Sequence, residues 1–242
     1  MKNNSKLPDL LRKAKNDLEA GLTLQSNTPN EAYWLQKLRN DRGLSCVELF
    51  AHKDVWQIRF GDNRRATDVS IFSSASCKLS ALLSEIDAAL DSRTIIEQRA
   101  KYVIDAAEIL SVDGNIHVVW ASKIFSFAFP EKPFHIVDSR VKNTIERFCQ
   151  EHAPQSQYVR GVRSTDRKRA YEAACKNIDN IMSVMHAREE FGAIVAHISE
   201  NTSVRQILHD DIAGHCKEKT KDTAEYLIRK RVVDKMLFYA AA

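Results

Sequence analysis

Residues 94–130 have the sequence TIIEQRAKYVIDAAEILSVDGNIHVVWASKIFSFAFP. Thr94 and Glu97 form a capping box at the start of a helix expected over 94–110, whose apolar residues recur with helical spacing. A short turn that contains an Asp-Gly pair follows. A nearly all-apolar helix is then expected over 116–129, where a proline ends it. The stretch therefore predicts two helices joined by a short turn.

The composition of the whole chain favours helices as well. Seven glycines and five prolines make up about 3% and 2% of the 242 residues, whereas soluble proteins average about 7% and 5%. This scarcity disfavours a turn-rich sandwich and any fold built on glycine loops. Since 44% of the residues are hydrophobic and 28% are charged, the chain can bury a sizeable core. We expect a mainly α protein, a helical bundle.

One segment before residue 92 differs, because apolar and polar residues alternate over 46–60 in the manner of a β-hairpin. We therefore predict two domains, with N-terminal helices and a β-hairpin in 1–92 and a helical domain in 93–242. The expected helices outside 94–130 cover 7–20, a segment that begins at a Thr28–Glu31 capping box, 79–90, a segment capped by Asp138, 165–186, 203–216 and 223–240.

Several classes of protein are disfavoured by the sequence. No apolar run is long enough to span a membrane, and the N-terminus lacks the apolar core of a signal peptide. We therefore expect a soluble, cytoplasmic protein. The five cysteines are scattered, which favours reduced thiols over a disulfide framework or a metal cluster. A histidine- and aspartate-containing segment at 209–216 matches no standard metal site, so we expect no metal and no cofactor.

Positive charge is concentrated in residues 160–169. The decamer holds five basic residues and one acidic residue, which gives a charge of +4, equal to the net charge of the whole chain. Such a cluster is either a solvated helix start or a phosphate-binding patch. The basic residues are Arg160, Arg163, Arg167, Lys168 and Arg169.

Lys123 is the most informative residue of the apolar helix. It is the only formally charged side chain between His117 and Pro130. Burial of a lysine lowers its pKa, and a lysine with a lowered pKa is an amine nucleophile. The alternative is a lysine that extends its ammonium group to water from the edge of the helix.

Asp138 lies fifteen residues further along, in the sequence FHIVDSRV of residues 134–141. The apolar residues before it deliver the carboxylate to the first turn of a helix. There it can accept backbone N–H groups and remain ionised. An ordinary N-cap explains the same residue, and the two interpretations are compatible.

At Lys123 and Asp138 the sequence resembles the helix-hairpin-helix DNA glycosylases, and within them the 8-oxoguanine DNA glycosylase branch. Residues 94–129 resemble the helix-hairpin-helix motif, and Lys123 falls at the position of the catalytic lysine of bifunctional members. The segment around Asp138 resembles the family's catalytic aspartate segment. Arg140 takes the position of a histidine that approaches a DNA phosphate. The resemblance covers residues 94–145, and the hairpin has HVVWASK where the family usually has LPGVGxK.

The resemblance implies a DNA glycosylase with AP-lyase activity that acts on double-stranded DNA. Lys123 would attack C1′ and Asp138 would stabilise positive charge on the sugar. Arg140 and the basic residues of 160–169 would bind phosphates, and Phe127, Trp120 and Phe238 are candidates for the pocket of a flipped base, each also explained as simple core.

The expected target is an oxidised purine or a modified base of phage DNA, which would make the protein an antiviral defence enzyme. We expect a monomer. Two alternatives remain: a non-catalytic helix-hairpin-helix DNA-binding module, and an all-helical protein-interaction protein. Only the nucleic-acid interpretations predict DNA affinity that falls steeply with salt.

Overall fold

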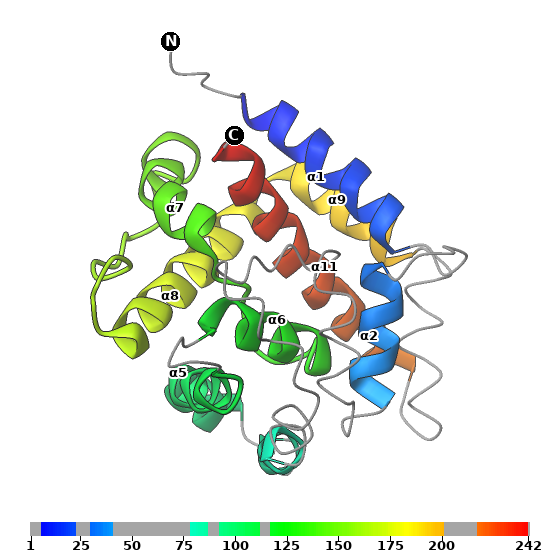
Figure 1. The fold of residues 1–242 in the computed structure, drawn as a ribbon. Coiled ribbons are helices and arrows are strands. Elements are labelled where there is room, and N and C mark those ends of the chain that lie inside the picture. Colours follow the sequence, from blue (N-terminus) through cyan, green and yellow to red (C-terminus); the bar gives the residue numbers. More distant parts are fainter. Residues whose placement is uncertain are drawn as a thin grey trace.

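The computed structural model describes residues 6–22, 30–40, 78–86, 92–111, 117–200 and 217–241. All regular elements within these ranges are helices (Figure 1), which confirms the predicted mainly α class. They are α1 (Leu7–Gly21), α2 (Glu31–Asn40), a helix over 78–86, α5 (Ser92–Ile109), α6 (Val118–Ala128), α7 (Ser139–His152), α8 (Arg167–His186), α9 (Glu189–Ser199) and α11 (Lys217–Ala240). The β-hairpin predicted over 46–60, the helix predicted over 203–216 and the turn at Gly114 lie outside the described residues.

Two details differ from the sequence prediction. Helix α9 was not expected, and the side chain of its N-cap residue, Arg188, makes no capping hydrogen bond, so a usual start signal is missing. Helix α2 begins at Glu31, and the side chain of Asn30 caps it by accepting a hydrogen bond from the backbone N–H of Tyr33 at 3.0 Å. The side chain of Glu31, predicted to close a capping box, instead contacts α11.

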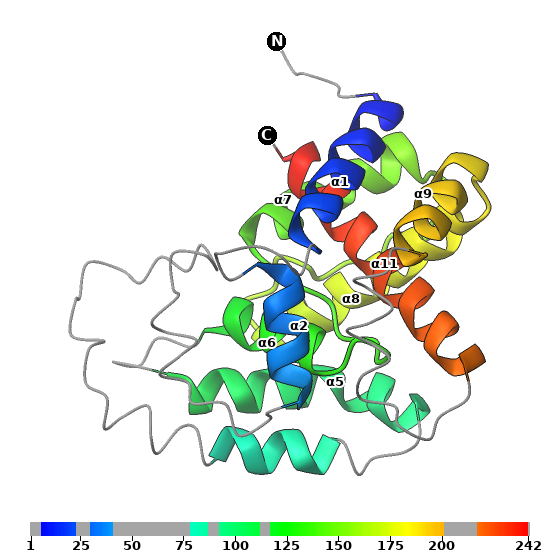
Figure 2. The ribbon, with the colours of Figure 1, turned by 90° about the vertical axis from the view of Figure 1, so that its right-hand side faces the viewer.

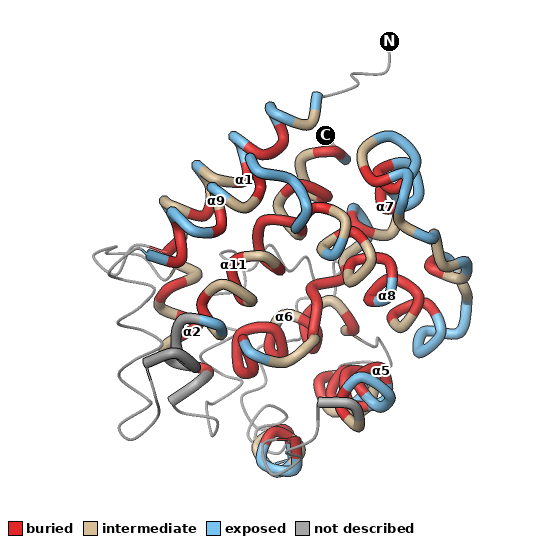
Figure 3. The backbone as a smooth tube through the Cα atoms, turned by 180° about the vertical axis from the view of Figure 1, so that it is seen from behind, coloured by how far each residue is buried: buried red, intermediate tan, exposed pale blue. Residues whose placement is uncertain are grey.

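Helix α11 lies at the centre of the molecule. It packs against α1, α7, α8 and α9, while α2 packs on α6 and α5 packs on α6 and α8 (Figures 1 and 2). Buried residues from all these helices belong to one hydrophobic core, and Figure 3 shows them on the helix faces that meet around α11. The described parts of both predicted domains thus share a core, while the boundary near residue 92 stays a prediction.

Within the described ranges, no helix is both long enough and apolar enough to cross a membrane. Helix α6 comes closest to an all-apolar helix, and nine of its eleven residues are buried. It lies below α11 and beside α2 in Figure 1. Lys123 of α6 therefore lies on the side of the helix that meets residues of α1, α2 and α11.

Candidate active site

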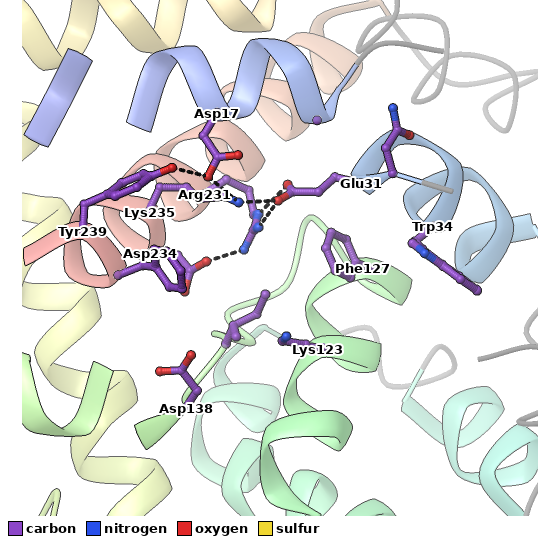
Figure 4. A pocket seen from close by; sticks show the side chains of 14 residues that line it. Asp17, Glu31, Trp34, Lys123, Phe127, Asp138, Arg231, Asp234, Lys235 and Tyr239 are labelled. Carbon is purple, nitrogen blue, oxygen red and sulfur yellow. Dashed lines mark hydrogen bonds and ion pairs between the residues drawn. The ribbon is translucent and has the colours of Figure 1, made fainter. Parts of the chain in front are cut away.

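A cavity of about 460 Å³ lies between the N-terminal helices, α6 and α11 (Figure 4). Lys123 and Asp138 both line it, although they come from different elements. The remaining lining residues are Asp17, Gly21, Asn30, Glu31, Trp34, Phe127, Ile136, Arg231, Asp234, Lys235, Phe238 and Tyr239. The volume lies in the range of pockets that hold small organic ligands.

Lys123 lies in the middle of α6, whose other residues are almost all buried. Burial is the main cause that lowers the pKa of its ammonium group below the ordinary lysine value. The nearby carboxylates of Asp234 and Asp138 oppose this change, and Arg231 adds to it. The predicted direction of the shift is confirmed, and the amine is neutral over a wider pH range than that of an exposed lysine.

Asp138 is the N-cap of α7, as the sequence predicts. Its Oδ1 accepts a hydrogen bond from the backbone N–H of Val141 at 2.8 Å, which fixes the carboxylate at the start of the helix. The preceding residue, Val137, donates its backbone N–H to the hydroxyl of Ser122 on α6 at 3.3 Å. Since Ser122 neighbours Lys123, this bond ties the two candidate catalytic elements together.

A buried polar network holds the segment before Asp138. Arg99 of α5 is 0% exposed, and its guanidinium donates to the carbonyl of Pro133 at 3.2 Å and to Asp179 of α8 at 2.7 Å. The other Asp179 oxygen pairs with Nε2 of His135 at 2.6 Å. The hydroxyl of Tyr171 donates to the carbonyl of His135 at 3.0 Å. The path of the chain towards Asp138 is therefore fixed by residues from two helices.

The wall opposite α6 is charged and joins the two ends of the chain. Arg231 of α11 donates to Glu31 of α2 through Nε at 3.1 Å and to Asp234 through NH1 at 2.6 Å. Lys235 lies 2.9 Å from both Asp17 of α1 and Glu31. Burial alone would raise the pKa of Glu31, but Arg231 and Lys235 lower it to about 2. Figure 4 shows these side chains facing the cavity from α1, α2 and α11.

Two of the three predicted base-pocket residues line the cavity, and the third does not. Phe127 and Phe238 line the cavity with Lys123, and Trp34 of α2, which sequence reasoning missed, also lines it. Trp120 is 1% exposed in the core and is not among the cavity residues. The rings of Phe127 and Phe238 each face an arginine, at 5.3 Å from Arg231 and 4.3 Å from Arg140.

The predicted phosphate-binding residues are all at the surface. Arg140 is exposed in the first turn of α7, and Arg160, Arg163, Arg167 and Lys168 are exposed in and before the first turn of α8. Burial and the nearby positive charge of Arg167 lower the pKa of Lys142, whereas the negative charge of Asp138 raises it. Arg167 therefore lies near the turn of α7 that Asp138 caps.

The structure adds five charged residues that the sequence analysis did not identify as part of a site: Asp17, Glu31, Arg231, Asp234 and Lys235. Their contacts join the first and last helices, over about 200 residues, so no local spacing could reveal them. Within the described ranges no group of three or more His, Cys, Asp and Glu side chains could hold a metal ion. The segment 209–216 is outside those ranges.

No protein-family model, no curated protein and no solved structure matches the chain. The chemistry of the site therefore has to be inferred from its own residues.

Proposed function

We propose that this protein is a DNA glycosylase with AP-lyase activity. The observation that carries the proposal is that an amine with a lowered pKa, Lys123, and a carboxylate fixed at a helix N-terminus, Asp138, line one cavity together with aromatic rings. The resemblance of residues 94–145 to the helix-hairpin-helix glycosylases assigns the same two residues to the reaction.

Cleavage of an N-glycosidic bond passes through a transition state in which the sugar becomes positively charged. The carboxylate of Asp138 would stabilise that charge. The neutral amine of Lys123 would form a bond from Nζ to C1′ as the bond from C1′ to the base breaks, and the bonding pair would leave with the base nitrogen. Opening of the sugar ring then gives a Schiff base, from which β-elimination cleaves the strand.

The rest of the site is consistent with a nucleotide that has left the duplex. Such a base needs a pocket with flat apolar surfaces, and Phe127 and Phe238 supply these at the cavity. In this proposal α5 and α6 are the helices of the helix-hairpin-helix motif, and the exposed arginines and Lys168 bind phosphates without reading sequence. The target is an oxidised purine or a modified base of phage DNA.

The proposal is tested with a duplex that contains one abasic site, because this substrate does not require the target base to be known. The protein is incubated with the duplex, borohydride is added, and a covalent adduct is sought on a denaturing gel. We expect an adduct that is lost in Lys123→Ala and retained in Lys15→Ala, a lysine on the outer part of α1 that pairs with Glu19.

An adduct that persists in Lys123→Ala would contradict the proposal, because another amine would then be trapped. The absence of an adduct, combined with salt-dependent DNA binding, would favour the non-catalytic DNA-binding module instead.

A further inference from the structure

Lys230 of α11 is a buried lysine that the proposed reaction does not use. It is 2% exposed, and within the described residues its ammonium group makes no ion pair. Arg99 and Arg231, which are also buried, each pair with two carboxylates. Burying an amine is costly unless hydrogen bonds offset the loss of water. The hydrogen bonds of Lys230 therefore indicate what this side chain does.

The Nζ atom of Lys230 donates to two backbone carbonyls of the segment that connects α6 to α7. The acceptors are the carbonyl of Lys132 at 2.9 Å and the carbonyl of Phe134 at 3.4 Å. This segment is neither helix nor strand, so no helix or sheet hydrogen bonds hold it in place. Because one side chain binds carbonyls two residues apart, it fixes the course of the backbone between them.

Side chains from three helices bind four consecutive carbonyls of this segment. Between the two acceptors of Lys230, the carbonyl of Pro133 accepts a hydrogen bond from Arg99 of α5 at 3.2 Å. The next carbonyl, that of His135, accepts one from the hydroxyl of Tyr171 of α8 at 3.0 Å. Lys230 thus supplies the contacts from α11 to a segment that α5 and α8 hold from other sides.

The last of these four carbonyls lies only three residues before Asp138. Of the two residues between them, Val137 donates its backbone N–H to the hydroxyl of Ser122 at 3.3 Å, and Ile136 lines the cavity. A shift of the bound carbonyls therefore reaches the carboxylate of Asp138 through a short stretch of backbone that is itself held.

Lys230 also connects this segment to the wall of the cavity. The next residue of α11, Arg231, lines the cavity, and Figure 4 shows its guanidinium across the cavity from Lys123 and Asp138. One turn of α11 therefore contacts the backbone before Asp138 with one residue and the cavity with the next.

We propose that Lys230 is a positioning residue for the reaction: by binding the carbonyls of Lys132 and Phe134, it holds Asp138 in place relative to Lys123 and to the wall formed by α11. This inference rests on the proposed glycosylase function, in which Asp138 has to lie close to the sugar cation. A displacement of about 1 Å can slow an enzyme reaction by about 10²-fold. Loss of the two hydrogen bonds should therefore change the rate.

The test is cyanoborohydride trapping on the abasic duplex at saturating protein concentration, measured from acidic to alkaline pH. Lys230→Met keeps an unbranched apolar side chain and removes the donor. We expect the plateau rate at alkaline pH to fall by up to about 10²-fold. The midpoint should move to lower pH, because a displaced Asp138 raises the pKa of Lys123 less. Lys230→Arg, which keeps N–H donors, should recover part of the plateau rate.

Lys15→Met is the matched control, because it makes the same change at a lysine on the outer part of α1 that pairs with Glu19. It should trap with the plateau rate and the midpoint of the wild type.

The direction of the midpoint shift separates positioning from a charge effect. The charged groups that line the cavity with Lys123 are Asp17, Glu31, Asp138, Arg231, Asp234 and Lys235. Removal of the Lys230 charge alone would leave the midpoint unchanged or move it to higher pH, since a nearby positive charge lowers the pKa of a lysine. A midpoint at lower pH therefore indicates a displaced carboxylate.

A double-mutant cycle tests whether that carboxylate is Asp138. If Lys230 acts through Asp138, adding Lys230→Met to Asp138→Asn should cause no further loss of rate and no further shift of the midpoint. If the two losses multiply, or if folded Lys230→Met traps with the wild-type plateau and midpoint, the inference is wrong and the proposed function stands. If the wild type gives no adduct that depends on Lys123, the proposed function fails and the inference fails with it.

The methionine variant leaves two carbonyls without this donor, so its folding is checked by circular dichroism and thermal melting. If it does not fold, Lys230→Gln takes its place, because its amide keeps N–H donors but is one bond shorter than the lysine side chain. A smaller fall of the plateau rate and a shift of the midpoint in the same direction are then expected. A wild-type plateau and midpoint in the folded glutamine variant would overturn the inference.

Discussion

The guanidinium of Arg140 lies 4.3 Å from the centre of the Phe238 ring, so an exposed residue of α7 covers an aromatic ring that lines the cavity. Arg140 is the residue at which the resemblance places a phosphate contact. A phosphate that binds this guanidinium would therefore also change the contact between the guanidinium and the Phe238 ring.

We expect Arg140→Ala to weaken DNA binding and to reduce the slope of log affinity against log salt by about 0.9, the contribution of one phosphate contact. Arg140→Lys should keep the slope, because it keeps the charge, but it should bind less tightly because it loses the planar, forked geometry of the guanidinium. Fluorescence anisotropy across a salt series measures both quantities. An unchanged slope in the alanine variant would show that Arg140 does not contact a phosphate.

The basic cluster before and in α8 should contribute affinity without sequence preference. Replacing Arg163 and Arg167 by Gln removes two exposed charges and should reduce the same salt slope by about 2. The loss should be equal on duplexes of unrelated sequence. Arg12→Gln, an exposed arginine of α1 that pairs with Asp9, is the matched control and should leave the slope unchanged. Equal losses in both variants would mean that the cluster is only a solvated helix start.

The lowered pKa of Lys123 predicts how trapping depends on pH. Only the neutral amine attacks, so the rate should rise with pH and reach its midpoint below the ordinary lysine value of about 10.4. Asp138 raises the pKa of Lys123, and Asp138→Asn should therefore move the midpoint to lower pH. Base excision should nevertheless be slower in this variant, because the sugar cation loses its stabilising carboxylate. A midpoint at the ordinary lysine value would indicate a fully solvated amine.

The pairing of Glu31 with Arg231 and Lys235 predicts loss of stability in acid. The folded state holds the pKa of Glu31 at about 2, compared with about 4.5 for the free side chain. Because the folded value is the lower one, the pairing stabilises the protein fully above pH 4.5, and this contribution is lost as the pH falls towards 2. Its size is about 3 kcal/mol.

Urea unfolding at a series of pH values measures this effect. Glu31→Gln should lower the free energy of unfolding by about 3 kcal/mol at neutral pH and show a flatter acid limb. Glu189→Gln, at an exposed position of α9, should follow the wild type at every pH. If the free energy of unfolding of Glu31→Gln falls in acid as it does in the wild type, Glu31 is not the cause of the loss of stability.

The buried polar network that holds the segment before Asp138 should affect both the free energy of unfolding and the rate of trapping. Asp179→Asn removes one of the two carboxylates that pair with the buried Arg99, which keeps Glu172, and it should cost about 2 kcal/mol. Tyr171→Phe removes one hydrogen bond to the carbonyl of His135 and should cost about 1 kcal/mol. Chemical denaturation gives both values, and borohydride trapping should slow in Asp179→Asn under conditions where it is still folded. Trapping at the wild-type rate would mean that Asp138 is placed without this network.

The helices and the N-cap position of Asp138 could be predicted because their signals are local, whereas the pairing of Lys123 with Asp138 was expected only from the resemblance to the helix-hairpin-helix glycosylases. Apolar spacing marks α5 and α6, and an aspartate ahead of a helix marks an N-cap. Glu31 shows why the charged wall could not be predicted. Its spacing from Thr28 fits a capping box, yet its partner is Arg231, at the other end of the chain. Trp120 is the reverse case, since an aromatic residue near Lys123 belongs to the core and not to the cavity.

Because the wall of the cavity is made by α1, α2 and α11, the site is assembled from the first and the last helices that the structure describes. A ribosome synthesises α1 and α2 before Lys123 and Asp138, and it synthesises α11 after them. While the chain is still being made, Lys123 and Asp138 are already present but lack the wall that encloses them. A chain that stops before residue 217, and equally a fragment of residues 93–242, contains both candidate catalytic side chains without the enclosed cavity. Lys123 is therefore enclosed only after α11 has been synthesised.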